Sequence, residues 1–190
     1  MNIYTTISIS FCILIYLYLA HKIRKGNAEQ NLATWVSWVL LDTVAGASLF
    51  VQDGNWYLLA MYVAGGTMIS SFIFRSAKFK WGIVEKTSLL LVVVSIIIWT
   101  RSGPWYATIV STIGVAIATC PQLKDAILEP ATQPIEVYIG FTIVNGLAVA
   151  GGKAWTIDER FYPAVCTILC ALIVGFSSRK YFFVEKPHGA

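Results

Sequence analysis

Of the 190 residues of this chain, 57% are hydrophobic and only 13% are charged, whereas about a quarter of the residues in a soluble domain carry a charge. The mean hydropathy of +0.68 predicts a single domain embedded in a lipid bilayer. The net charge of +4 comes from basic residues clustered between long apolar stretches, so it does not indicate a nucleic-acid partner.

Seven apolar stretches are predicted to cross the bilayer as helices. They lie at residues 3–20, 32–51, 56–74, 84–100, 105–120, 134–150 and 161–176. Backbone groups in lipid must be hydrogen-bonded within the segment, and these runs lack the alternation of a transmembrane barrel strand. The first stretch is predicted to remain as a permanent span. The cleanly apolar part of the fourth, residues 87–100, is short for a bilayer, because Glu85 and Lys86 lie at its edge.

The basic residues predict the orientation of the chain, since lysine and arginine gather on the cytoplasmic side of a membrane. With the N-terminus outside, all but three of the 14 lysines and arginines face the cytoplasm. The three on the outer side are Arg101, Lys153 and Arg160, and those inside are Lys22, Arg24, Lys25, Arg75, Lys78, Lys80, Lys86, Lys124, Arg179, Lys180 and Lys186. We therefore expect a protein of the plasma (inner) membrane with a cytoplasmic C-terminus.

The second and sixth predicted helices share a pattern of two aromatic residues, a carboxylate or amide, and an alanine, at spacings that place all four on one helical face. The matching sets are Trp35, Trp38, Asp42 and Ala45, and, about a hundred residues later, Tyr138, Phe141, Asn145 and Ala148. This repeat predicts two related three-helix bundles. A three-helix unit has an odd number of spans, so two parallel copies need a linker helix between them. The predicted divisions are 1–80, 81–103 (the linker) and 104–190.

The stretch Cys120-Pro121-Gln122-Leu123-Lys124 resembles the proline-glutamine motif of PQ-loop proteins, and Pro134, which enters the next helix, also suits that pattern. With the three-plus-one-plus-three plan, the chain resembles a divergent, bacterial-like member of the SWEET and PQ-loop (MtN3-type) transporter superfamily. The resemblance implies transport by alternating access, with Pro121, Gln122 and Pro134 at hinges. The alternative for Pro121 is that it merely ends its helix.

The first half departs from that family pattern. It has Ala20-His21-Lys22 where a second Pro-Gln pair would be expected. The asparagines that sugar carriers of the family place in their third and seventh spans are also missing. Those spans offer Tyr62, Thr67, Ser70, Thr167 and Cys170 instead.

Asp42 is the sharpest candidate for a functional residue. It lies about ten residues, or roughly 15 Å, into its predicted helix, where a carboxylate costs on the order of 2.5–3.5 kcal/mol. We therefore expect Asp42 and Asn145 to face a shared central cavity and to hydrogen-bond a polar solute, with Asp42 able to carry a proton. The alternative is a structural hydrogen bond between helices, worth about 0.6 kcal/mol in membranes.

The aromatic residues beside this pair are predicted to contact the solute as well. Trp38 and Phe141 lie about one turn from Asp42 and Asn145, where a flat polar solute could stack on them; the alternative is packing in the core or against lipid. Trp35 and Tyr138 lie nearer the membrane surface and suit either a gate or the interfacial aromatic belt. No metal or cofactor is predicted, because all four cysteines lie inside apolar runs and show no metal-binding pattern.

The favoured function is transport of a small polar solute, with a sugar as the first candidate, by uniport or with proton coupling. An amino acid or a vitamin is an alternative solute, and a non-transporting receptor on the same scaffold is an alternative function. A retinal protein is excluded because residues 161–176 contain no lysine, and a haem carrier because His21 and His188 both lie at helix ends. An enzyme is not expected, since Asp42 has no titratable neighbour in its span.

Overall fold

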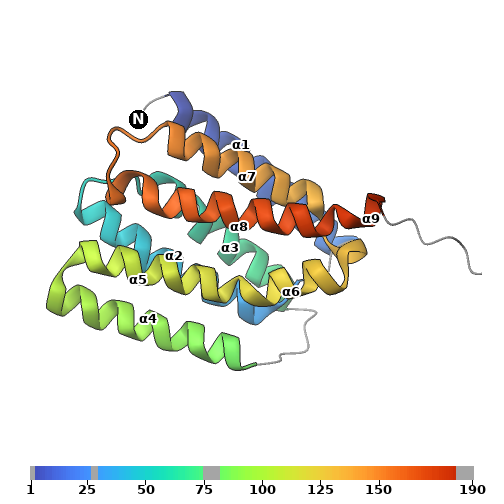
Figure 1. Ribbon diagram of the computed structural model, residues 1–190, viewed down its shortest axis with the longest axis horizontal. Helices are drawn as coiled ribbons and strands as arrows, with labels where there is room; N and C mark the ends of the chain where they lie inside the picture. Colours follow the sequence, from blue (N-terminus) through green and yellow to red (C-terminus); the bar gives the residue numbers. More distant parts are fainter. Residues whose placement is uncertain (1–2, 27–29, 75–81, 183–190) are drawn as a thin grey trace, which may run out of the picture.

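The computed structural model describes residues 3–26, 30–74 and 82–182, without the side chains of residues 84, 85 and 182, and this part of the chain is helical with no strand (Figure 1). The helices are α1 (Ile3–Arg24), α2 (Leu32–Val51), α3 (Tyr57–Phe74), α4 (Ile83–Ser102), α5 (Pro104–Ala118), α6 (Cys120–Leu128), α7 (Ile135–Ala150), α8 (Tyr162–Ser177) and α9 (Arg179–Phe182). A 3₁₀ turn, Pro130–Thr132, precedes α7, and a π-helical turn, Ile157–Phe161, precedes α8. The predicted all-α class is confirmed.

Several helices are long and apolar enough to cross a membrane. Among the described residues, the five that meet this test are α1, α2, α3, the continuous stretch Pro104–Leu128, and the stretch Ile157–Tyr181. Helix α7 is apolar but shorter, and α4 has 20 residues, which corresponds to about 30 Å. The outer surface of α4 exposes Leu90, Val93, Ile96 and Ile97. Apolar side chains on the outside of a helical bundle are expected where it meets lipid.

The helix ends follow from local sequence. Asn31 caps α2 by accepting a hydrogen bond from the backbone of Ala33 (2.9 Å). Gly103 has φ +96° and ends α4, and Pro104 directly after it begins α5, where the missing N–H costs nothing. Helix α4 extends to Ser102, beyond the predicted end at residue 100, because backbone hydrogen bonding continues through the polar residues that a hydropathy pattern leaves out.

Pro121 does not end its helix. Helix α5 stops at Ala118, Thr119 joins it to α6, and α6 carries Pro121 in its first turn and continues to Leu128. Proline suits the first turn of a helix because the N–H it lacks would have no partner there. Helix α5 does end just before Pro121, but the chain continues as helix beyond the proline, and α5 and α6 form one interrupted rod (Figure 1).

Six rods form a closed ring in which each packs on two neighbours. Helix α3 packs against both α1 and α2, and α8 packs against both α7 and the α5–α6 rod. The ring is completed where α1 packs along α7 and α2 packs along α5. Helix α4 lies outside the ring against α5 and α2, as Figure 1 shows.

The two ends of the bundle differ in charge. Helices α1, α6 and α9 finish at one end, which we call the basic end; the α2–α3, α4–α5 and α7–α8 connections lie at the opposite end (Figure 1). Of the lysines and arginines that the structure describes, seven belong to the basic end and three to the opposite end. The seven are Lys22, Arg24, Lys25, Lys86, Lys124, Arg179 and Lys180.

Candidate functional site

The ring encloses a cavity of about 80 Å³ that every one of its six rods helps to line. All six residues predicted to contact a solute lie on its wall: Trp35, Trp38 and Asp42 from α2, and Tyr138, Phe141 and Asn145 from α7. These residues run from the part of each helix near the basic end to the middle of α2 and just past the middle of α7. The cavity therefore extends from the centre of the bundle toward the basic end.

Asp42 is held at the cavity wall by a tyrosine from the other side of the ring. It is 5% exposed and lies near the middle of α2. The hydroxyl of Tyr162, the first residue of α8, donates a hydrogen bond to its Oδ1. Tyr162 is fully buried, so the contact is shielded from solvent. The carboxylate thus has one neutral donor joining α2 to α8.

Asn145 presents an unused acceptor to the same cavity. Its Nδ2 donates to the backbone oxygen of Phe141 (2.8 Å), which fixes the amide orientation because Oδ1 would be repelled by that carbonyl. Oδ1 is then buried without a hydrogen-bond partner in the described structure, and so is the hydroxyl of Tyr62 on α3. A buried polar atom without a partner costs about 1–3 kcal/mol, so this wall is suited to a solute that hydrogen-bonds both.

Aromatic rings are the commonest side chains on the remaining wall. Seven of them line the cavity: Tyr16, Trp35, Trp38, Tyr62, Tyr138, Phe141 and Tyr162. The rings of Tyr16 and Tyr62 meet the ring of Phe141 edge-on, with centroids 5.3 and 5.9 Å apart. Trp35 and Tyr138 are each 4% exposed, so they face the cavity and not the lipid. These contacts form an aromatic cage around the polar atoms.

Tyr16 reaches the cavity because α3 carries a glycine beneath its ring. A Cβ atom on Gly65 would lie 2.3 Å from the ring of Tyr16, far inside van der Waals contact. The small residue therefore lets α1 and α3 approach closely enough for the ring to turn inward. No pattern in the sequence singled out Tyr16 or the pairing of Tyr162 with Asp42.

The predicted hinge residues lie outside the cavity, at the basic end. Gln122 of α6 is buried, and its Nε2 donates to Oε1 of Gln133 in the connection to α7. Lys180 of α9 donates to the backbone oxygen of Gln133 (3.2 Å). Pro134 is buried and directly precedes α7. These contacts fix how α6, α7 and α9 meet beside the cavity.

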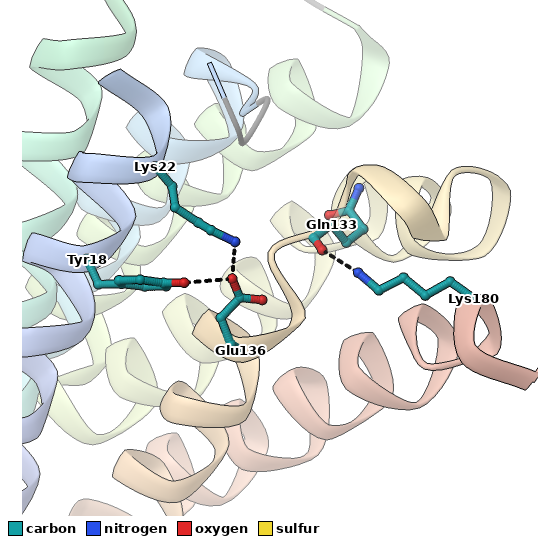
Figure 2. A network of polar contacts seen from close by, with 5 residues as sticks. All are labelled: Tyr18, Lys22, Gln133, Glu136 and Lys180. Atoms are coloured by element: carbon teal, nitrogen blue, oxygen red, sulfur yellow. Dashed lines mark hydrogen bonds and ion pairs between the residues drawn. The ribbon is translucent and has the colours of Figure 1, made fainter. Parts of the chain in front are cut away.

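A second polar cluster joins α1 to α7 at the same end. Figure 2 shows Lys22 and Tyr18, both from α1, converging on the Glu136 carboxylate in the first turn of α7. Lys22 and Glu136 form an ion pair, and the Tyr18 hydroxyl donates to the same oxygen at 3.0 Å. We call these three residues the α1–α7 clamp. It lies at the contact of α1 with α7, one of the two contacts that complete the ring.

Hydrogen bonds from backbone and side chains link the helices at the opposite end. The N–H of Asn55, after α2, donates to the backbone oxygen of Asp158 in the π-helical turn (3.3 Å). The Arg160 guanidinium donates to the carbonyls of Val149 (2.6 Å) and Gly152 (2.7 Å), which ties the turn before α8 to the end of α7. Gln52 of α2 also donates to the Thr108 hydroxyl of α5 (3.1 Å). Several direct links therefore hold these elements together at this end.

In the described part of the chain, no group of three or more His, Cys, Asp or Glu side chains is placed to hold a metal ion. Thr67 and Thr167, which the third and seventh spans offered as polar candidates, donate hydrogen bonds to carbonyls of their own helices instead (both 2.7 Å).

Comparisons with protein-family models, curated proteins and solved structures give no match. What the chain does must therefore be inferred from the cavity itself.

Proposed function

We propose that this protein is a membrane transporter that carries a small polar solute through the central cavity by alternating access. The observation that carries the proposal is Asp42, a buried carboxylate in the middle of an apolar helix that lines a cavity. Ionisable groups inside a membrane are costly and generally mark a solute or ion pathway. A purely structural bond to Tyr162 needs no carboxylate, because an amide would accept it at lower cost.

The proposal includes two parallel three-helix halves joined by a linker, as in the SWEET and PQ-loop proteins that the sequence resembles. Its support is the packing: α3 contacts α1 and α2 in the same way that α8 contacts the α5–α6 rod and α7. The corresponding helices are α1 and α5, α2 and α7, and α3 and α8. Under this correspondence the contact of α1 with α7 matches the contact of α5 with α2, whereas α4 has no counterpart. Midplane sites between such repeats are common in transporters. The proposed halves are 1–80 and 104–190, with the linker at 81–103.

We place the basic end in the cytoplasm, following the rule that positive charge accumulates there. The described basic residues favour this orientation, whereas Arg75, Lys78, Lys80 and Lys186 lie outside the described residues. The cavity then lies toward the cytoplasmic side. Rocking of the halves about Pro121 and Pro134 would open one end as it closes the other.

Transport by purified protein in liposomes tests the proposal. Labelled glucose, choline, lysine and nicotinamide riboside sample the neutral, cationic, amino-acid and vitamin classes, and at least one should enter in a saturable way. Uptake should fall strongly in Asp42→Asn and persist in Asp53→Asn. The second variant makes the same chemical change at an exposed turn residue whose φ of +53° asparagine tolerates.

A non-transporting receptor on this scaffold would bind one of these solutes without moving it. Binding in detergent combined with flux no faster than in empty liposomes would therefore reject the transporter. A pH gradient imposed on the same liposomes separates uniport from proton coupling, because only coupled transport accumulates solute against its own gradient.

A further inference from the structure

We infer that the solute of the central cavity is a small organic cation with an alkylated ammonium head and no carboxylate of its own. The inference rests on the proposed function for the movement of this solute, but its binding can be measured separately. It follows from three features of the cavity wall: its charge, its aromatic rings and its unused hydrogen-bonding atoms.

The charge of the wall is unbalanced. The described residues that line the cavity include one carboxylate, Asp42, and no lysine, arginine or histidine. Its hydrogen-bond donor, the Tyr162 hydroxyl, carries no charge. The ionised form of a carboxylate taken out of water is strongly unfavourable unless a cation accompanies it, and without one the group takes up a proton. With no basic residue on the wall, a positively charged solute supplies the missing partner.

The aromatic rings suit an alkylated ammonium group. Tyr16, Tyr62 and Phe141 form a cluster of edge-on contacts beside Asp42, and Trp38 and Tyr138 extend the wall toward the basic end. Aromatic faces attract cations through the ring quadrupole, and quaternary ammonium groups are commonly held in such cages. A sugar would use the same faces but would leave Asp42 without a counter-charge.

The unused polar atoms and the size of the cavity restrict the rest of the solute. Asn145 Oδ1 can accept a hydrogen bond, and the Tyr62 hydroxyl can donate or accept one, which fits a hydroxyl or amine near the ammonium head. At about 80 Å³ the cavity is well below the 300–1,000 Å³ of a typical drug-sized ligand pocket. An amino acid is disfavoured because its carboxylate would meet no basic side chain on the wall.

Binding of choline and of its neutral counterpart 3,3-dimethyl-1-butanol to the full chain in lipid nanodiscs tests the inference. The two ligands share shape and hydroxyl and differ in one atom, the nitrogen that carries the charge. Choline should raise the unfolding temperature and bind about 10-fold or more tightly than the alcohol, since cation–π and charge contacts contribute about that ratio. Asp42→Asn should lose most of this preference, and Asp53→Asn should keep it.

The outcomes separate this inference from the transporter proposal. Equal binding of choline and the alcohol, or no binding of choline, overturns the inference, and both measurements use the unaltered protein. Choline binding without flux into liposomes supports the inference and rejects the transporter. Saturable glucose uptake that choline does not inhibit rejects the inference and leaves the transporter standing. A preference for choline that is unchanged in a folded Asp42→Asn variant also overturns it.

Discussion

Tyr162→Phe removes one buried hydroxyl, the group of α8 that donates to Asp42 of α2. The ring stays in place, so packing is preserved and only the hydrogen bond is lost. Tyr162 is 1% and Asp42 is 5% exposed, so bulk water has little access to the Asp42 oxygen that loses its donor. The variant therefore reports how much the carboxylate depends on this donor.

The expected loss of stability is about 1.5–3 kcal/mol, the range for a hydrogen bond to a charged group. Polar contacts between helices in membranes average only about 0.6 kcal/mol, because unfolded helices in lipid also find partners. We expect the larger value here, since the acceptor is a carboxylate and both groups are buried. A double-mutant cycle with Asp42→Ala should give a coupling free energy of about 1 kcal/mol or more.

Reversible unfolding in mixed detergent micelles, followed by tryptophan fluorescence, measures this difference. Tyr106→Phe serves as the control, because it removes the same atom from a side chain that is 52% exposed; its effect should lie within about 0.5 kcal/mol. If Tyr162→Phe is as mild as Tyr106→Phe, the hydroxyl does not stabilise Asp42. The account of how the carboxylate is held would then be refuted.

Three further variants test the mechanism and the packing. Pro121→Ala introduces a backbone N–H in the first turn of α6 and should slow solute exchange more than it weakens binding, as measured by flux and by titration. Glu136→Gln breaks the ion pair with Lys22, whose side chain is 23% exposed; such a pair contributes about 0.2–1 kcal/mol, so the half-saturation concentration should change by no more than about 5-fold. Gly65→Ala forces a Cβ into the ring of Tyr16 and should lower stability by about 1–3 kcal/mol.

A different result would contradict each of these three predictions. Equal exchange rates in Pro121→Ala and the parent protein would reject a hinge at that position. A change in half-saturation concentration well above 5-fold in Glu136→Gln would contradict the small contribution expected of this partly exposed ion pair. For the glycine, the control is Gly146→Ala, where an added Cβ meets nothing within 4 Å; equal effects of the two glycine variants would contradict the close packing of Tyr16 on α3.

The helices could be predicted from the sequence because hydropathy and helical hydrogen bonding agree over most of the chain. Helix α2 begins and ends at the predicted residues 32 and 51. Helix α1 extends to Arg24, beyond the predicted residue 20, because polar residues end an apolar run but not a helix. The continuation of α6 past Pro121 was missed for a related reason: proline disrupts a helix interior but is tolerated in a first turn.

The cavity could be predicted only in part. The aromatic and polar residues of α2 and α7 share one face of each helix through the 3.6-residue period, and all six reach the cavity. The partner of Asp42 could not be found in this way, because Tyr162 lies 120 positions along the chain and meets it only through the packing of the ring. The inward turn of Tyr16 depends on the space above Gly65 in another helix, which no local pattern encodes.

Access to Cys170 from each side of the membrane tests the central claim most directly. Cys170 lines the cavity and is partly exposed; a variant that keeps it and replaces Cys12, Cys120 and Cys166 carries a single thiol. A membrane-impermeant methanethiosulfonate with a trimethylammonium group is added to vesicles of each orientation. Alternating access predicts that Cys170 is labelled from either face. Labelling from one face alone, in the presence and absence of solute, would contradict it.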